Sequence, residues 1–316
     1  MGARLASRSI CGANTNAVAS EFRGRLPKRI LDSHFHIFRA AEVPDAGLTS
    51  APKLRRDFAF ADYRAAWDGL PVVGGVMVQV RDEADGLAEA ADIAREAAGE
   101  SGIAAMVGGN PVEESGRRAE LDTLRANPLV RGIRRGTQFH PDPLYLARPE
   151  LIAGFRRVAE LGLVPEVCVK HFQLDGVIAL ADALPDTTLV LDHLGKPELV
   201  AGDQPQWRRR MAELARHPGV VVKVSVILQQ PDDPPLPREA VRPIVHQVVE
   251  LFGWDRVLFG SNWPVSTLVV GYRDWVELLL DAFSDATDDE LDRLFYRNAA
   301  RVWRTPNRTL GASRAE

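Results

Sequence analysis

The 316-residue sequence contains only two cysteines, Cys11 and Cys168. Two thiols exclude a disulfide framework and a cysteine-rich zinc site, and a reducing compartment is therefore expected. No window approaches 18 consecutive apolar residues, so no membrane-spanning helix is predicted. The first 28 residues lack the apolar segment of a secretory signal. We therefore expect a cytoplasmic protein that has no membrane partner.

Neither sign of charge is in excess, because 39 Lys and Arg residues face 43 Asp and Glu residues. Nucleic-acid affinity depends on clustered cations that neutralise phosphates, so this balance argues against a nucleic-acid partner. Hydrophobic residues make up 46% of the chain and charged residues 26%, which is typical of a globular protein with a large core. A small-molecule partner is expected, and a homo-oligomer is left open.

Short apolar segments alternate with amphipathic stretches from Ile30 onward. The segments expected to form strands are rich in Val, Ile and Leu without a polar alternate, as strands buried on both faces are. They are residues 30–32, 72–80, 104–108, 130–134, 163–169, 188–192, 220–224 and 256–259. Helices are expected at residues 84–98, 149–161, 206–217, 238–252 and 273–283.

This alternation predicts an α/β protein whose parallel sheet closes into a single-domain (β/α)8 TIM barrel. An open doubly wound sheet is the alternative, but the sequence lacks the glycine-rich turn that such a sheet would require after the first strand. Residues 29–304 are expected to form the barrel, between a flexible arm at 1–28 and a tail at 305–316. Two long loops, 38–57 and the proline-rich 229–237, are expected at the C-terminal mouth, where active sites of this fold are built.

Histidines gather at the ends of the predicted strands. The first strand runs into Ile-Leu-Asp-Ser-His-Phe-His, so His34 and His36 lie two residues apart and on the same side of a strand. His171 follows the fifth strand, and His193 follows the sixth. In a barrel these ends meet at one mouth, where imidazoles can share a metal ion or a substrate group. Histidines satisfied by the core or by Asp32 are the structural alternative.

Other polar side chains lie at the same strand ends. An arginine fork suits a substrate carboxylate, and since adjacent strand residues alternate, one of Arg134 and Arg135 faces outward; we prefer Arg134 as the inner residue. For Lys223 an ion pair in the barrel wall is the alternative, and for Trp263 packing at the rim. The residues expected to bind substrate are Gln79, Arg134, Arg135, Lys223 and Trp263.

The eighth strand is followed by Gly-Ser-Asn-Trp-Pro-Val. Together with His-x-His and with Asp-His-Leu-Gly-Lys-Pro after the sixth strand, this motif resembles the amidohydrolase superfamily. The resemblance is closest to its amidohydrolase-2 branch, which holds fuconolactonase-like and 2-pyrone-4,6-dicarboxylate lactonase-like proteins, and it covers about residues 29–304. It implies a distorted (β/α)8 barrel and a hydrolase that opens a lactone or cyclic ester of a sugar acid or a (di)carboxylic acid.

The resemblance implies that His34, His36, His193 and Asn262 are the catalytic residues. Asn262 stands where the family keeps the carboxylate that activates water. An amide cannot accept a proton, so Asn262 can orient water but cannot be the base. We expect His193 to serve as base or to position it, and no metal to be required. If zinc is bound, the expected ligands are His34, His36 and His171.

Two further functions stay open at the level of sequence. One is a metal-dependent decarboxylase or lyase of the same superfamily. The other is a non-catalytic barrel that has lost its general base and binds a small acid. In each case the expected ligand is an acidic or polyhydroxy small molecule.

Overall fold

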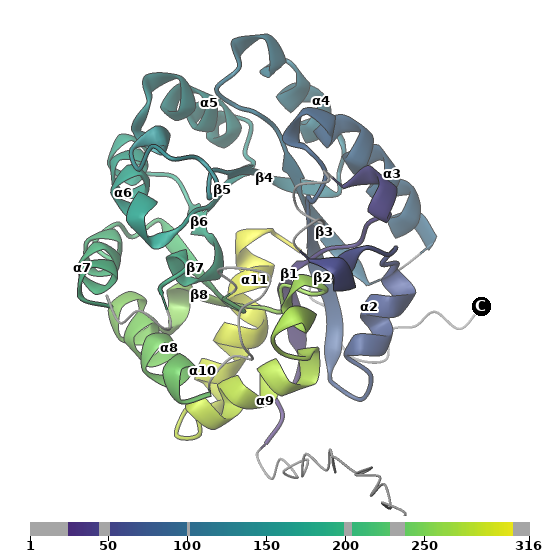
Figure 1. Ribbon diagram of the computed structural model, residues 1–316, viewed down its shortest axis with the longest axis vertical. Coiled ribbons are helices and arrows are strands. Elements are labelled where there is room, and N and C mark those ends of the chain that lie inside the picture. The colour runs from purple at the N-terminus through teal and green to yellow at the C-terminus, as the bar shows by residue number, and fades with distance from the viewer. Residues whose placement is uncertain (1–24, 44–50, 100–101, 199–203, 228–237, 306–316) are drawn as a thin grey trace, which may run out of the picture.

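The computed structural model describes residues 25–43, 51–99, 102–198, 204–227 and 238–305. Eight parallel strands follow one another around one sheet in the order β1 to β8 (Figure 1). A backbone hydrogen bond of 2.8 Å from Asn262 to the carbonyl of His34 links the segment after β8 to the end of β1. The predicted (β/α)8 barrel is therefore confirmed.

All eight predicted strands are present with shifted ends. Their bounds are β1 Ile30–Phe35, β2 Val72–Val78, β3 Ile103–Gly109, β4 Val130–Gly136, β5 Val164–Cys168, β6 Leu189–Leu191, β7 Val220–Ser225 and β8 Val257–Gly260. The strands β1 and β4 extend further toward the mouth than the apolar pattern indicates, because polar residues continue them. The predicted loop 229–237, residues 44–50 of the loop 38–57, residues 1–24 of the arm and residues 306–316 of the tail lie outside the described residues.

Helices surround the sheet in Figure 1. They are α2 Phe60–Ala66, α3 Gly86–Gly99, α4 Glu120–Ala126, α5 Pro149–Glu160, α6 Leu174–Ala183, α7 Gln204–Leu214, α8 Arg238–Phe252, α9 Tyr272–Ala282, α10 Asp288–Asp292 and α11 Asn298–Val302. The five predicted helices are α3, α5, α7, α8 and α9. The predictions omitted α2 and α4, which are too short to repeat a helical period clearly, and α6, whose sequence is apolar on most sides. No helix in the described part of the chain is long and apolar enough to cross a membrane.

The apolar core has two parts. Outside the barrel, residues such as Phe35 and Val167 pack with the apolar faces of the helices. Inside the barrel, a second cluster joins strand residues to the C-terminal segment and includes Leu31, Val76, Ala105, Val164, Val190, Val221, Leu258, Tyr296, Val302 and Trp303. The segment around α11 therefore supplies the floor of the barrel interior.

Above this floor the inward-facing side chains become charged. Alternate residues of a strand share a face, so Val164 and Glu166 of β5 point inward together, as do Val221 and Lys223 of β7. Glu166 and Lys223 have no exposed surface. The barrel therefore carries a buried charged layer between its apolar floor and its mouth.

An irregularity in β1 decides where its histidines point. Asp32 pairs with Gly75 and Phe35 pairs with Met77, so three steps along β1 match two steps along β2. Leu31 belongs to the inner core whereas Phe35 belongs to the outer one, although in a regular strand they would share a face. The extra residue reverses the alternation, as a β-bulge does. The residues on either side of Phe35 consequently face the barrel interior.

We predict that Trp303→Ala lowers the free energy of unfolding by about 3–5 kcal/mol, because removing a buried tryptophan leaves a cavity. Trp303 is 1% exposed and lies beneath the Lys223 ammonium, which is 5.2 Å from its ring centre. Urea unfolding followed by circular dichroism measures the change. The control is Phe139→Ala, which removes an 82% exposed ring and should change stability by less than about 0.5 kcal/mol. Equal losses in both variants would contradict the floor role of Trp303.

Candidate active site

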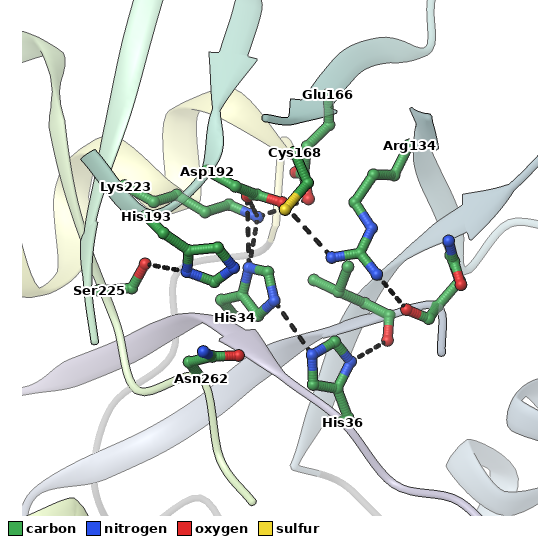
Figure 2. Close-up of polar contacts among 12 residues, drawn as sticks. His34, His36, Arg134, Glu166, Cys168, Asp192, His193, Lys223, Ser225 and Asn262 are labelled. Atoms are coloured by element: carbon green, nitrogen blue, oxygen red, sulfur yellow. Dashed lines mark hydrogen bonds and ion pairs between the residues drawn. The ribbon is translucent and has the colours of Figure 1, made fainter. Parts of the chain in front are cut away.

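Three imidazoles meet inside the mouth of the barrel. His34 and His36 come from the end of β1, and His193 comes from the turn η7 (Asp192–Gly195), which follows β6 directly. The Nε2 atoms of His34 and His36 are 3.2 Å apart, and the ring centres of His34 and His193 are 4.6 Å apart. Figure 2 shows the three rings grouped around the Asn262 side chain, with His193 and His34 above it and His36 beside it. The structure therefore brings together the four residues that the sequence assigns to catalysis.

The cluster lies deep in the barrel. His34 has no exposed surface, whereas His36 and His193 are 4% exposed and Asn262 is 5% exposed. A small molecule can therefore reach only the edges of the His36, His193 and Asn262 side chains, and His34 lies behind them.

A left-handed turn after β6 presents His193. His193, Leu194 and Lys196 have φ values of 50°, 58° and 47°, which cost L-residues roughly 1–2 kcal/mol each. The Trp207 indole holds the turn by donating to the Leu194 carbonyl at 2.8 Å. The Nδ1 atom of His193 lies 2.8 Å from the Ser225 hydroxyl, so the opposite edge of the ring faces His34. The strained residues are therefore those that orient the His193 imidazole toward His34.

Asn262 also has a positive φ, of 56°, in a region that asparagine adopts more readily than most residues. Its side-chain Nδ2 points to the Val226 carbonyl at 3.5 Å. This contact leaves Oδ1 directed toward the histidines, as Figure 2 shows. Asn262 therefore offers the site a hydrogen-bond acceptor that cannot remove a proton.

A buried ion cluster supports the histidines from below. The Lys223 Nζ lies 2.7 Å from Glu166 Oε1 and 3.0 Å from Asp192 Oδ1. The same ammonium is hydrogen-bonded to His34 Nδ1 at 3.2 Å. The other oxygen of Asp192 lies 3.4 Å from Arg134 Nη1. Lys223, expected to bind substrate, is thus fully buried beneath His34 in the ion-pair arrangement that was its alternative.

Burial and nearby cations keep the imidazoles neutral. Burial, with the Arg134 guanidinium, lowers the pKa of His36 to about 3. Burial and the Lys223 ammonium hold the pKa of His34 well below its usual value. Burial also holds the pKa of His193 well below its usual value, with the Lys196 and Lys223 charges adding to the effect. Each ring therefore has one unprotonated nitrogen at neutral pH.

The two buried acids behave differently. Burial and the Asp192 charge raise the pKa of Glu166 to about 8. Burial opposes the ionisation of Asp192, but the Lys223 ammonium together with the contacts to His34 and His193 holds the pKa of Asp192 well below its usual value. At neutral pH one carboxylate therefore faces two cations, Lys223 and Arg134. The layer beneath the histidines is consequently positive, which favours negative charge that develops above it.

The adjacent arginines of β4 point in opposite directions. Arg134 faces inward, where its Nη2 donates to the Gln79 carbonyl at 2.6 Å. Arg135 faces outward and is held by Glu113 at 2.5 Å and Glu83 at 3.1 Å. Among the described residues nothing hydrogen-bonds to the buried side-chain oxygen of Gln79. Arg134 and Gln79 therefore border the histidine cluster, and Arg135 does not.

Trp263 contributes its backbone to the site. Its carbonyl accepts a hydrogen bond of 2.7 Å from the His36 amide. Its ring is only 3% exposed and meets Phe58 edge to face at 5.5 Å. The indole therefore packs behind the site, as the rim-packing alternative proposed.

His171 lies apart from the other histidines. The strand β5 ends at Cys168, and the chain has turned into η6 (His171–Gln173) before the imidazole is reached. Its Nε2 faces Glu198 at 3.4 Å. The described residues contain one group of three possible metal ligands whose donor atoms lie within 4.8 Å, namely His34, Asp192 and His193. The structure thus does not assemble the expected set of His34, His36 and His171.

Two imidazoles and a carboxylate are ligands that zinc accepts. However, each oxygen of Asp192 already faces a cation, Lys223 on one side and Arg134 on the other. The ammonium also lies 3.2 Å from His34 Nδ1, between the carboxylate and the imidazole. In this arrangement the group of His34, Asp192 and His193 does not fit a divalent cation.

Sequence reasoning missed the buried partners Glu166, Asp192 and Ser225. Glu166 carried a signal, because it is a lone acid inside the apolar strand β5, and charged residues are rarely buried unless they are paired or functional. Asp192 also carried a signal as the residue before His193. Ser225 had none, since its contact with His193 depends on how β7 lies beside the turn after β6.

Comparisons with known proteins agree with this geometry. A family model described as Amidohydrolase (Amidohydro_2) matches residues 31–305. An L-fucono-1,5-lactonase of Burkholderia ambifaria is 31% identical over 64% of this chain and 71% of its own length. A 2-pyrone-4,6-dicarboxylate hydrolase of Comamonas testosteroni is 28% identical over 76% of this chain and 78% of its own. The crystal structure of an amidohydrolase from Burkholderia multivorans with bound zinc superposes with a TM-score of 0.78 at 28% identity, covering 88% of this chain and 99% of that one.

We predict that the protein loses stability as the pH falls below about 6.5. The pKa values of His34, His36 and His193 are lowered by folding, so the unfolded chain binds up to three protons there that the folded protein does not. Glu166, with its pKa raised to about 8, offsets one of these protons. Urea unfolding should show a decrease of about 1–3 kcal/mol per pH unit between about pH 6.5 and pH 5. A free energy of unfolding that is constant or rises over this range would show that the imidazoles are not buried as neutral groups.

Proposed function

The chain belongs to the amidohydrolase family, and from this premise we propose that it is a hydrolase that opens the ring of a small lactone. The observation that carries the proposal is the group of three neutral imidazoles at the mouth, above a positively charged layer and beside the Asn262 amide. Acyl transfer to water needs stabilisation of a developing oxyanion and an acceptor for the proton of water; the positively charged layer can supply the first and the His193 imidazole the second. The lactonase names of the relatives support the same reaction class.

We propose that the substrate is a lactone of a sugar acid or of a (di)carboxylic acid. Arg134 is the inward guanidinium of β4 and keeps 12% of its side chain exposed, so it can contact a carboxylate or a polyhydroxy ring. The free oxygen of Gln79 can accept a hydrogen bond from a hydroxyl group. Both groups lie next to the histidines, so a lactone bound by them would hold its carbonyl carbon close to the imidazoles.

In the proposed reaction, a water molecule attacks the carbonyl carbon of the lactone. Asn262 Oδ1 accepts one hydrogen bond from that water and orients it, and His193 takes its proton. The positive charges of Arg134 and Lys223 stabilise the carbonyl oxygen as it becomes negative. The bond from the carbonyl carbon to the ring oxygen then breaks, and His193 returns the proton to that oxygen. The product is the open hydroxy acid, and the proton count is balanced.

We propose that this reaction requires no metal ion. The buried cations Lys223 and Arg134 already supply positive charge beneath the carbonyl site. Asp192, the carboxylate nearest to the imidazoles, is neutralised by these same cations. The proposal therefore depends on the charges that the chain itself provides.

The test is a panel of aldonolactones and cyclic (di)carboxylic lactones, with acid release followed by a pH indicator. We predict that at least one lactone is opened and that His193→Ala lowers kcat by about 100-fold or more, the usual scale of general acid–base help. Circular dichroism should show an intact fold in the variant. Failure to open any lactone, or full activity of His193→Ala, would contradict the proposed function or the proposed base.

We further predict that Arg134→Gln raises KM at least tenfold for a lactone that bears a carboxylate, because a two-pronged charged contact is lost. Arg135→Gln is the matched control, since it removes the same charge from the opposite side of β4. Its effect on KM should stay below about threefold. A larger effect of Arg135→Gln than of Arg134→Gln would mean that the substrate lies outside the barrel mouth described here.

A further inference from the structure

We infer that Lys223 is a positioning residue that fixes the tautomer of His34, with the ring proton on Nε2. In this state His34 is the hydrogen-bond donor of the β1 pair and His36 is the acceptor. The inference rests on a chain of contacts that begins at a backbone carbonyl and ends at the buried ammonium.

The first contact in this chain assigns the tautomer of His36. The Nδ1 atom of His36 lies 2.7 Å from the Val78 carbonyl oxygen. A carbonyl oxygen only accepts hydrogen bonds, so Nδ1 carries the proton. Because the ring is neutral, its Nε2 holds a lone pair.

The second contact determines the proton on His34. Its Nε2 lies 3.2 Å from the Nε2 of His36, which is the bare nitrogen. Two bare nitrogens at this distance would repel each other, whereas an N–H on His34 makes a hydrogen bond. The proton of His34 is therefore on Nε2, and its Nδ1 is an acceptor.

The third contact holds this arrangement in place. Lys223 Nζ lies 3.2 Å from His34 Nδ1, and an ammonium can only donate. Asp192 Oδ1 lies 3.3 Å from the same nitrogen and is the one competitor for it among the described residues. That oxygen lies closer to the Lys223 ammonium, at 3.0 Å, so its charge is directed at the cation and His34 Nδ1 is left to accept. The chain from Lys223 through His34 and His36 to Val78 is complete and runs in one direction (Figure 2).

The position of Lys223 leaves it little freedom. Its ammonium is fully buried, forms an ion pair with Asp192, lies 2.7 Å from a Glu166 oxygen, and lies above the ring of Trp303. These partners come from different strands and from the C-terminal segment. The donor to His34 is thus fixed by the packing of the whole barrel.

This tautomer also determines what the two β1 histidines can do in the reaction, and this point rests on the proposed function. His34 has no exposed surface and donates its one ring proton to His36, so it acts on the reaction through His36 and not by contact with the substrate. His36 donates to the Val78 carbonyl and accepts from His34, so it has no proton to donate to the oxyanion.

The tautomer also affects metal affinity. If His34 were protonated on Nδ1, the two bare Nε2 atoms would converge at 3.2 Å. Two nitrogens bound tetrahedrally at the usual zinc distance are separated by about 3.3 Å. Lys223 therefore disfavours zinc in two ways, through its positive charge and by keeping a proton on one of these nitrogens.

The test uses the full chain labelled with ¹⁵N-histidine, with His34 assigned through the signals lost in His34→Gln. In the parent protein, ¹⁵N–¹H correlation spectra should show the His34 proton on Nε2 and none on Nδ1. A proton on Nδ1 in the parent would overturn the inference without any further variant. This readout requires no substrate, so the outcome of the lactone panel does not influence it.

The variant that tests the role of Lys223 is Lys223→Met combined with Glu166→Gln, which removes the cation without leaving its buried acid unpaired. We expect the His34 proton to move to Nδ1 and face Asp192. We also expect zinc affinity, measured by competition with a fluorescent chelator, to rise at least tenfold. The control, Glu166→Gln alone, keeps Lys223 and should retain both the tautomer and the zinc affinity of the parent.

Lys223→Arg provides a conservative rescue, because it keeps a buried cation that can donate to His34. It should retain the Nε2 tautomer. An unchanged tautomer in the Lys223→Met/Glu166→Gln protein, or the same shift in Glu166→Gln alone, would overturn the role of Lys223. If the double variant fails to fold by circular dichroism, the parent spectrum together with Lys223→Arg decides the question.

Discussion

The site depends on one buried ammonium. Lys223 lies at the centre of the barrel, within 3.2 Å of an oxygen or nitrogen atom on each of Glu166, Asp192 and His34. Removing a charged group from water costs several kcal/mol, and such a group persists only where its partners restore that energy. The partners of Lys223 come from β1, β5 and the end of β6, so the same contacts that solvate the charge also fix these strand ends relative to one another. The positions of the histidines at these strand ends therefore depend on this cluster.

Two local departures from regular geometry aim the imidazoles above it. The extra residue in β1 turns His34 and His36 inward, and the left-handed turn after β6 directs His193 toward them. Both features cost conformational energy, which the surrounding structure must offset. The apolar floor below and the helices outside supply that stabilisation, because they bury most of the hydrophobic residues. The geometry of the candidate site and the stability of the fold therefore depend on different layers of the same barrel.

The charge of the site follows from what occupies its acidic positions. The position after β8 is occupied by Asn262, which adds no negative charge. Asp192 is neutralised by two cations, and burial raises the pKa of Glu166 to about 8. The resulting positive layer opposes a divalent cation and favours the anionic or polar ligand proposed above.

The sequence by itself determined the order of strands and the barrel, because apolar runs that alternate with amphipathic stretches are local patterns. It also determined that His34, His36, His193 and Asn262 meet, because each lies at the end of a strand. The period-two alternation of a strand separated Arg134 from Arg135. Other features were decided only by the tertiary structure. They are the reversal of alternation in β1, the burial of Lys223 beneath His34, the pairing of Ser225 with His193, and the distance of His171 from the cluster. Each depends on the register between strands that are far apart in the sequence, and a local pattern carries no information about which side chain of one strand lies opposite which side chain of another.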